Sequence, residues 1–404
     1  MWKNVIGEER VKKIIRQSLE AKKLPNAYLF SGAEGLGKDA MAIELAKALN
    51  CTDPRSNGTE ACDECPNCKS IGSLGSPLLH FVFALAKDSK KEETASDDED
   101  EVSKIDIIRE QIEMKAADPY YHIQIPKALT INIKQIRDLR MLLSRSVVGS
   151  SVGRTLSPSE SPERTKSPSH HFPKRIVIIS EAHTMRREAQ NAFLKTLEEP
   201  HDNTLIILTS SNPSRLYATI LSRCQDMRFD LLAPAEIAKA LIERDDLDKK
   251  QAEFLARLSG GSFSAARSLI NEDVAALRTQ VVQLLRMGLS RSRRNAIAEI
   301  DNFLPRAGGG SFLEKRQTIE QLLHLLTLWL RDALAISSGS EEYLFNNDQL
   351  DDLKKFTSRF GVPRNIVKAL RTVETAQRNV HLQLQLRPVV LQMIMDMEQA
   401  LIPL

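Results

Sequence analysis

A glycine-rich segment near the N-terminus has the residue types and spacing of a phosphate-binding loop. It reads GAEGLGK, with glycines at Gly32, Gly35 and Gly37 and a lysine at Lys38. In such loops, backbone N–H groups and the positive end of the following helix hold phosphate oxygens, while the lysine reaches the outer phosphates. The next residue is Asp39, where magnesium chemistry normally uses a serine or threonine hydroxyl. The segment predicts a site for ATP or ADP that lacks an ordinary magnesium ligand, although an acidic residue is also simply favoured in a first helical turn.

A second position for magnesium chemistry is altered as well. The apolar run at residues 176–179 predicts a buried strand, and Ser180 and Glu181 follow it. Phosphate-loop ATPases end this strand with an aspartate that holds magnesium, and many follow it with a glutamate that activates the attacking water. Here the glutamate is present and the aspartate is absent. Because the metal neutralises charge that develops on the phosphates, we expect hydrolysis by this chain to be very slow.

Four of the five cysteines are close together in the sequence. Cys51, Cys62, Cys65 and Cys68 have the spacing C-x10-C-x2-C-x2-C. In a reducing cytosol this spacing favours metal over disulfides, and four thiolates suit a closed tetrahedral site for structural zinc. Free thiols and an iron–sulfur cluster are the alternatives.

The elements that must position these residues follow an alternating pattern. Short apolar strands and amphipathic helices alternate over residues 1–232, which predicts an α/β domain with a parallel sheet flanked by helices and a zinc module at 51–68. Two segments interrupt the pattern and are expected to be flexible insertions: an acidic one near 88–104 and a serine- and proline-rich one near 147–173. Residues 233–273 predict a small helical lid, and residues 274–404 predict an all-α domain.

Composition excludes some functional classes. The hydrophobic content of 42% is typical of a globular protein, and the apolar runs are too short for a bilayer span. The N-terminal residues lack the apolar core of a signal peptide, so we expect a cytoplasmic protein without a membrane partner. A net charge of +3 does not indicate a strong nucleic-acid binder. A DNA-binding module is an alternative function, in which the chain would contact DNA through the basic run of Arg286, Arg291, Arg293 and Arg294. Such runs are usually solvated helix faces.

Several motifs together resemble those of bacterial clamp-loader subunits of the AAA+ class. The resemblance is carried by the four-cysteine cluster and by LPNAYLFSG at 24–32, IKQIR at 133–137, AQNAFLKTLEEP at 189–200 and TILSRC at 219–224. It extends to about residue 271, apart from the two insertions, and is looser in the helical tail, where AQRNV at 376–380 matches best.

The resemblance implies roles for particular residues. Arg223, in the Ser-Arg-Cys motif, corresponds to the arginine finger that acts on the ATP of a neighbouring subunit, and Thr209 corresponds to the family's first sensor. Arginine fingers stabilise charge on a transferring phosphoryl group. Taken alone, Arg223 could instead form an intramolecular ion pair with Asp226 or Asp230.

The resemblance also implies partners and a division of labour. The expected partners are the gamma/tau and delta subunits of the DNA polymerase III clamp loader, the sliding clamp and primed DNA. Loss of both metal positions resembles the stator class of subunit, which does not hydrolyse ATP. The alternative is an ATP-hydrolysing motor subunit of the gamma/tau type in which Asp39 itself binds magnesium, because carboxylates are good magnesium ligands.

Overall fold

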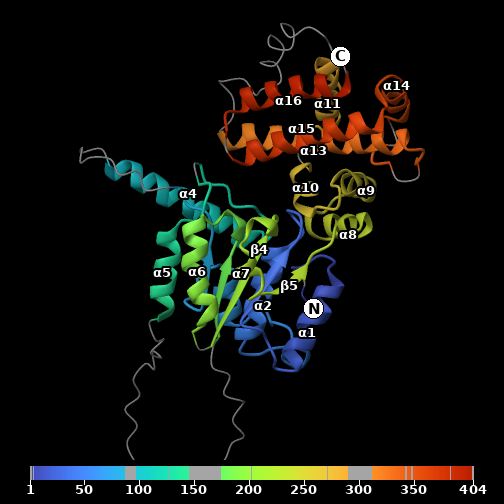
Figure 1. Cartoon of the computed structure of the whole chain (residues 1–404). Helices are drawn as coiled ribbons and strands as arrows, with labels where there is room; N and C mark the ends of the chain where they lie inside the picture. Colours follow the sequence, from blue (N-terminus) through green and yellow to red (C-terminus); the bar gives the residue numbers. More distant parts are fainter. Residues whose placement is uncertain are drawn as a thin grey trace, which may run out of the picture.

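A parallel β-sheet forms the centre of the N-terminal domain in the computed structural model (Figure 1). The model describes residues 2, 4–86, 97–126, 128–144, 174–201, 203–270, 272–289, 312–341, 344–346, 349–382 and 384–402. The sheet has five strands in the order β2-β3-β4-β1-β5, and all neighbours are parallel. The strands are β1 (Ala27–Ser31), β2 (Leu79–Val82), β3 (Arg175–Ile179), β4 (Thr204–Ser210) and β5 (Gln225–Arg228).

Helices cover both faces of this sheet. They are α1 (Glu9–Glu20), α2 (Lys38–Asn50), α3 (Pro66–Gly72), α4 (Asp97–Ala117), α5 (Ile133–Ser144), α6 (Arg187–Glu198) and α7 (Ala218–Leu221), with short 3-10 turns at Ser56–Gly58, Ala182–Thr184 and Pro213–Arg215. Successive strand residues point to opposite faces. Tyr28 and Phe30 therefore join the core that contains α1 and α2, whereas Leu29 joins the core that contains α5 and α6. The three central strands, β3, β4 and β1, are buried on both faces, which explains their continuous apolar runs.

Three short helices follow the sheet domain, α8 (Pro234–Asp245), α9 (Lys249–Leu258) and α10 (Phe263–Ser268). The break between α9 and α10 contains Gly260 and Gly261. Their φ angles of +62° and +91° are positive, a conformation that glycine adopts without steric cost. Ser262 then caps α10 by accepting a hydrogen bond from the backbone N–H of Ala265. These three helices fall in the range 233–273, where the sequence predicts a small helical lid, and are called the lid below.

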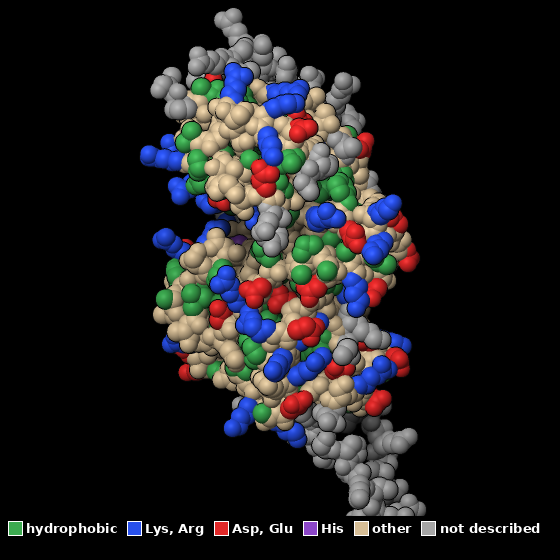
Figure 2. Space-filling model, turned by 90° about the vertical axis from the view of Figure 1, so that its right-hand side faces the viewer, with side chains coloured by type: hydrophobic (Ala, Val, Ile, Leu, Met, Phe, Trp, Pro, Cys, Tyr) green, Lys and Arg blue, Asp and Glu red, His purple; other side chains and the backbone are tan. Residues whose placement is uncertain are grey.

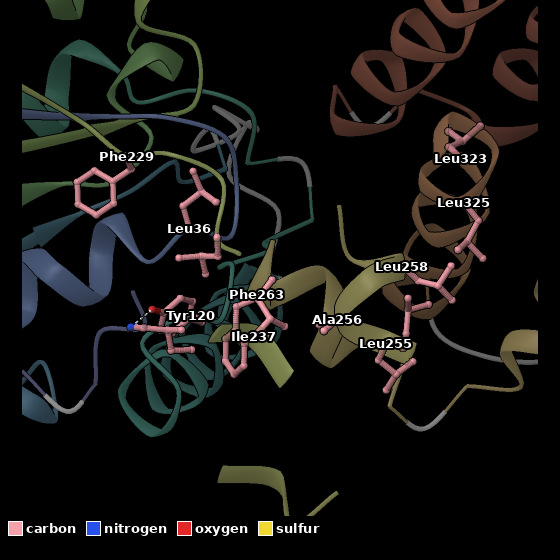
Figure 3. Packing of buried hydrophobic residues seen from close by; sticks show 14 of the residues in the cluster. Leu36, Tyr120, Phe229, Ile237, Leu255, Ala256, Leu258, Phe263, Leu323 and Leu325 are labelled. Atoms are coloured by element: carbon pink, nitrogen blue, oxygen red, sulfur yellow. Dashed lines mark hydrogen bonds between the residues drawn. The ribbon is translucent and has the colours of Figure 1, made fainter. Parts of the chain in front are cut away.

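The described part of the C-terminal region consists of helices and the turns that connect them. Its helices are α11 (Val274–Leu289), α13 (Phe312–Ser337), α14 (Leu350–Phe360), α15 (Pro363–His381) and α16 (Leu386–Leu401). They lie above the sheet domain in Figure 1, with the lid between them. Leu255 and Leu258 of the lid lie beside Leu323 and Leu325 of α13 in Figure 3, and all four belong to one continuous core. The fold class expected from the sequence is confirmed.

One expectation about the insertions is wrong. The acidic segment was expected to be flexible as a whole, but its residues from Asp97 onward form the start of α4, which continues to Ala117. Acidic side chains are favoured in the first turn of a helix, and the residues that follow them in α4 are good helix formers. The acidic residues from Asp97 onward are therefore compatible with helix. Residues 88–96 and the serine- and proline-rich insertion lie outside the described residues.

The surface and helix lengths agree with the composition. Lysine, arginine, aspartate and glutamate side chains are interspersed on the face shown in Figure 2. Among the described helices, none combines the length and apolar character that crossing a bilayer requires.

Candidate functional site

The phosphate-binding loop connects β1 to α2, as its sequence predicts. Gly35 and Gly37 have φ angles of +76° and +88°, which a side chain would strain, and α2 begins at Lys38. The Lys38 ammonium is 4% exposed and donates hydrogen bonds to the carbonyl oxygens of Gly32 (3.0 Å) and Ala33 (2.7 Å). The lysine is thus folded back onto its own loop.

Asp39 is bound on every side by groups from other segments. The ammonium of Lys115, from α4, lies 2.8 Å from Asp39 Oδ2. The hydroxyl of Ser180 donates to the same oxygen at 2.8 Å, and the hydroxyl of Thr209 donates to Oδ1 at 2.8 Å. Burial alone would raise the pKa of Asp39, but the Lys115 charge and these hydrogen bonds hold that pKa below its ordinary value. The carboxylate is therefore ionised and paired with a resident ammonium.

Glu181 is also anchored within the site. Its Oε2 accepts hydrogen bonds from the backbone N–H (2.9 Å) and hydroxyl (2.7 Å) of Ser211 and lies 3.1 Å from His183 Nδ1. Lys38 Nζ lies 3.6 Å from Oε1. Burial would raise the pKa of Glu181, but Lys38 and His183 hold it well below the ordinary value. The glutamate is a fixed anion, and its backbone N–H donates to Thr209 at 3.2 Å.

The segment after α4 and the lid both cover the phosphate-binding loop. A Cβ placed on Gly37 would lie 2.5 Å from the hydroxyl oxygen of Tyr120, so this tyrosine lies against the third glycine. The same hydroxyl accepts a hydrogen bond from the backbone N–H of Ile6 at 2.8 Å, drawn as a dashed line in Figure 3. At Gly35, the backbone carbonyl accepts a hydrogen bond from the N–H of Phe263 in the lid at 3.2 Å.

Lys115 and Tyr120 were not expected from the sequence. Neither belongs to a motif: α4 carries Lys115, and Tyr120 lies in the loop that follows this helix, beyond the acidic insertion expected near 88–104. The pattern around Lys115 is that of an ordinary helix, so no local signal marks either residue. Thr209 and Glu181, which were expected, do converge with Asp39 at the ends of β4 and β3.

The expected arginine finger lies at the end of α7 and is not part of this cluster. The guanidinium of Arg223 donates to the carbonyl of Thr219 and to the carboxylate of Glu198 in α6, both at 2.9 Å. Its side chain is 36% exposed. An intramolecular partner therefore exists, but it is Glu198; Asp226 instead accepts a hydrogen bond from Ser31, and Asp230 lies 3.4 Å from Arg10.

The four expected metal ligands converge. The Sγ atoms of Cys51, Cys62, Cys65 and Cys68 all lie within 4.8 Å of one another. Two of the separations, Cys51 to Cys65 and Cys62 to Cys68, are 4.0 Å. A tetrahedron with zinc–sulfur bonds of about 2.3 Å has edges of about 3.8 Å, and a disulfide would be far shorter. The spacing fits a four-thiolate zinc site.

Backbone groups also point at these sulfurs. The N–H of Cys62 donates to Cys51 Sγ at 3.3 Å, and the N–H of Cys65 donates to Cys62 Sγ at 3.2 Å. The N–H of Cys68 donates to Cys65 Sγ at 3.4 Å, and this sulfur caps the N-terminus of α3. Hydrogen bonds of this kind stabilise negative thiolate sulfur and orient metal ligands.

Comparisons with known proteins point to one family. Residues 7–152 and 161–233 match the family model described as DNA polymerase III, delta subunit. Residues 291–385 match the model described as DNA polymerase III, delta subunit, C terminal.

The individual proteins that match this chain have low sequence identity to it. The DNA polymerase III subunit delta' of Bacillus subtilis (strain 168) is 28% identical over 386 residues, which cover 95% of this chain and 95% of that protein. The subunit tau of the same organism is 26% identical over 281 residues, which cover 68% of this chain but only 38% of tau. The crystal structure of a DNA polymerase III gamma subunit-related protein from Thermotoga maritima MSB8 aligns over 97% of this chain and 99% of that chain, with 16% identity and a TM-score of 0.38.

Proposed function

The chain belongs to the family of DNA polymerase III delta subunits, and we propose that it acts in the clamp loader of that polymerase as a stator that does not hydrolyse ATP. In this role it supplies one arginine to the ATP site of a neighbouring subunit. Its partners are the gamma/tau and delta subunits, and the assembled complex places the sliding clamp on primed DNA.

The observation that carries the non-hydrolysing part of this proposal is the state of Asp39. A motor needs a magnesium ion that bridges the outer phosphates and neutralises their charge. Here Asp39 is paired with the Lys115 ammonium at 2.8 Å, and Ser180, which replaces the metal-holding aspartate, donates a hydrogen bond to it. A cation that is part of the chain already occupies the place beside Asp39 where a metal would be needed.

Arg223 is suited to act in trans. Its guanidinium is always charged and presents several donors in one plane, which matches phosphate oxygens. Two partners, Thr219 and Glu198, orient it at the surface, and it is exposed enough for a neighbouring phosphate to replace Glu198. Measured arginine fingers contribute about 10³-fold or more in rate.

The four cysteines are proposed to hold a structural zinc ion. Cys51, Cys62, Cys65 and Cys68 leave no open ligand position, so the ion would stabilise the region between α2 and α3 and take no part in chemistry.

The test is the clamp- and DNA-dependent ATPase of a clamp loader reconstituted from its motor subunits, delta, this chain, clamp and primed DNA. Arg223→Ala is compared with Arg228→Ala, which changes another exposed arginine nearby. Both complexes must first assemble equally by size-exclusion chromatography. We expect a loss of at least about tenfold for Arg223→Ala only. Equal ATPase rates in the two variants would refute a finger at Arg223.

A motor subunit is the second candidate, because Gly35, Gly37, Lys38 and Glu181 are all retained. In that case Asp39 would exchange Lys115 for magnesium when ATP binds. Magnesium-dependent ATP turnover by the isolated chain that disappears in Lys38→Ala would establish the motor and exclude the stator.

A further inference from the structure

We propose that residues 115–121 are an internal plug that takes the place of magnesium and nucleotide in this chain's own phosphate-binding site. The plug begins in the last turn of α4 and continues into the loop that follows it. In this view the site is a latent one: its binding residues are retained, and a segment of the same chain keeps nucleoside phosphates out. The proposal concerns nucleotide exclusion and does not depend on the role of Arg223.

The first argument concerns charge. Lys115 is 4% exposed and carries its ammonium into the site, where it lies 2.8 Å from Asp39 and donates to the carbonyl of Tyr121 at 2.7 Å. Asp39 lies directly after the loop lysine, at the N-terminus of α2, where the phosphates of a nucleotide and their metal would be held. Burying a lysine costs several kcal/mol unless it is paired. A chain that used magnesium at this point would have no room for that ammonium and no need of it.

The second argument concerns space. The Tyr120 hydroxyl touches Gly37, the glycine whose bare backbone should face phosphate, and also accepts the N–H of Ile6. Its ring packs edge-to-face on Phe263, with ring centroids 4.9 Å apart. The two side chains are neighbours in Figure 3. Tyr120 is 5% exposed. It therefore fills the space between the loop, the N-terminal segment and the lid with one aromatic side chain.

The third argument concerns the lid, which the plug ties down. Ser264 in α10 donates to the carbonyl of Tyr120 at 2.9 Å. Arg267 in the same helix lies 2.6 Å from Asp118 of the plug and 2.8 Å from Asp245 of α8. Arg267 is thus already paired with the plug. A nucleotide could enter only if the plug and the lid separated.

These contacts predict that weakening the plug opens the site. The probe is the fluorescent nucleotide mant-ADP with magnesium, titrated against the full-length chain. We expect no saturable binding to the natural chain up to about 1 mM, in the range of very weak affinity. The double variant Lys115→Ala/Tyr120→Ala should bind at least tenfold more tightly, and adding Lys38→Ala should remove that binding. Removing magnesium should also weaken nucleotide binding by the double variant, because Asp39 then has neither the Lys115 ammonium nor a magnesium ion beside it.

The matched control is Glu113→Ala, an exposed residue of the same helix, which should behave like the natural chain. Circular dichroism must show that the double variant is folded. If it does not fold, the variant Asp118→Asn is titrated in its place. This smaller change removes only the ion pair between Asp118 and Arg267. Tight, Lys38-dependent binding by the natural chain would overturn the plug. Absence of binding by a folded plug variant would also overturn it, because the loop itself would then be incompetent.

Discussion

The ammonium of Lys115 and the carboxylate of Asp39 lie 2.8 Å apart, and their side chains are only 4% and 14% exposed. Asp39 comes from the first turn of α2 and Lys115 from the last turn of α4. Both charges are removed from water, so each depends on the other for compensation. The ion pair therefore links the phosphate-binding loop to a helix whose first turns fall in the acidic insertion expected near 88–104.

This pair gives the first prediction. Lys115→Met should lower the free energy of unfolding by about 3 kcal/mol, because it leaves Asp39 buried without a cation. Urea denaturation at neutral pH measures the loss. The double variant Lys115→Met/Asp39→Asn should recover part of it, since the amide oxygen can accept a hydrogen bond from one of the two hydroxyls, Ser180 or Thr209, and the amide NH2 group can donate to the other. If the single variant is as stable as the natural chain, the pair does not have the energetic role described here.

The cysteine cluster gives the second prediction. Protein purified without added zinc should contain about one zinc ion per chain by atomic emission analysis. Cys68→Ser should lose the metal and lower the melting temperature, because Cys68 is a buried ligand. Cys224→Ser is the control and should keep both, since Cys224 lies on a different segment from the cluster. Metal-free protein with an unchanged melting temperature would exclude the zinc site.

The Arg223–Glu198 pair gives the third prediction. It is partly exposed, with side chains 36% and 48% accessible, so Glu198→Gln should cost less than about 1 kcal/mol of stability. In the reconstituted clamp loader this variant should retain ATPase activity, because the arginine needs to leave Glu198 in order to reach a phosphate. A loss as large as that of Arg223→Ala would show that the pair itself, and not a finger, supports activity.

Glu8 gives the fourth prediction, on pH dependence. Burial raises the pKa of this carboxyl to about 7, against an ordinary value of 4.5. The folded state therefore binds more protons than the unfolded state between these values, and stability falls as pH rises from about 4.5 through 7. Glu8→Gln should be more stable than the natural chain at pH 8 by about 1 kcal/mol, a figure reduced for partial solvent exposure.

The difference should shrink as the pH falls to 5, where Glu8 is protonated in the folded protein. The backbone N–H of Asp230 donates to Glu8 Oε1, and a glutamine oxygen can accept the same hydrogen bond. Thermal unfolding of both proteins across this pH range measures the effect. A stability difference that is constant with pH would mean that Glu8 does not titrate as described.

Local patterns in the sequence were sufficient for much of the fold. The loop from Gly32 to Lys38 and the buried strand at residues 176–179 were placed correctly, because each depends on neighbouring residues and on the backbone they permit. The cysteine spacing likewise brought four sulfurs together, since a short segment can reach only a few arrangements.

The partners of those residues were decided by tertiary structure. Lys115 pairs with Asp39, Tyr120 lies against Gly37, Arg223 pairs with Glu198 instead of Asp226 or Asp230, and Asp97 begins a helix. Each outcome depends on which distant segments pack side by side. The local periodicity of the sequence does not record such long-range packing. The sequence by itself determined that this protein has the glycine-rich loop of a phosphate-binding site, with Asp39 and Ser180 at the two positions where metal ligands are usual. Only the folded structure decided what lies in that loop, because a buried carboxylate takes whichever cation the packing brings within reach.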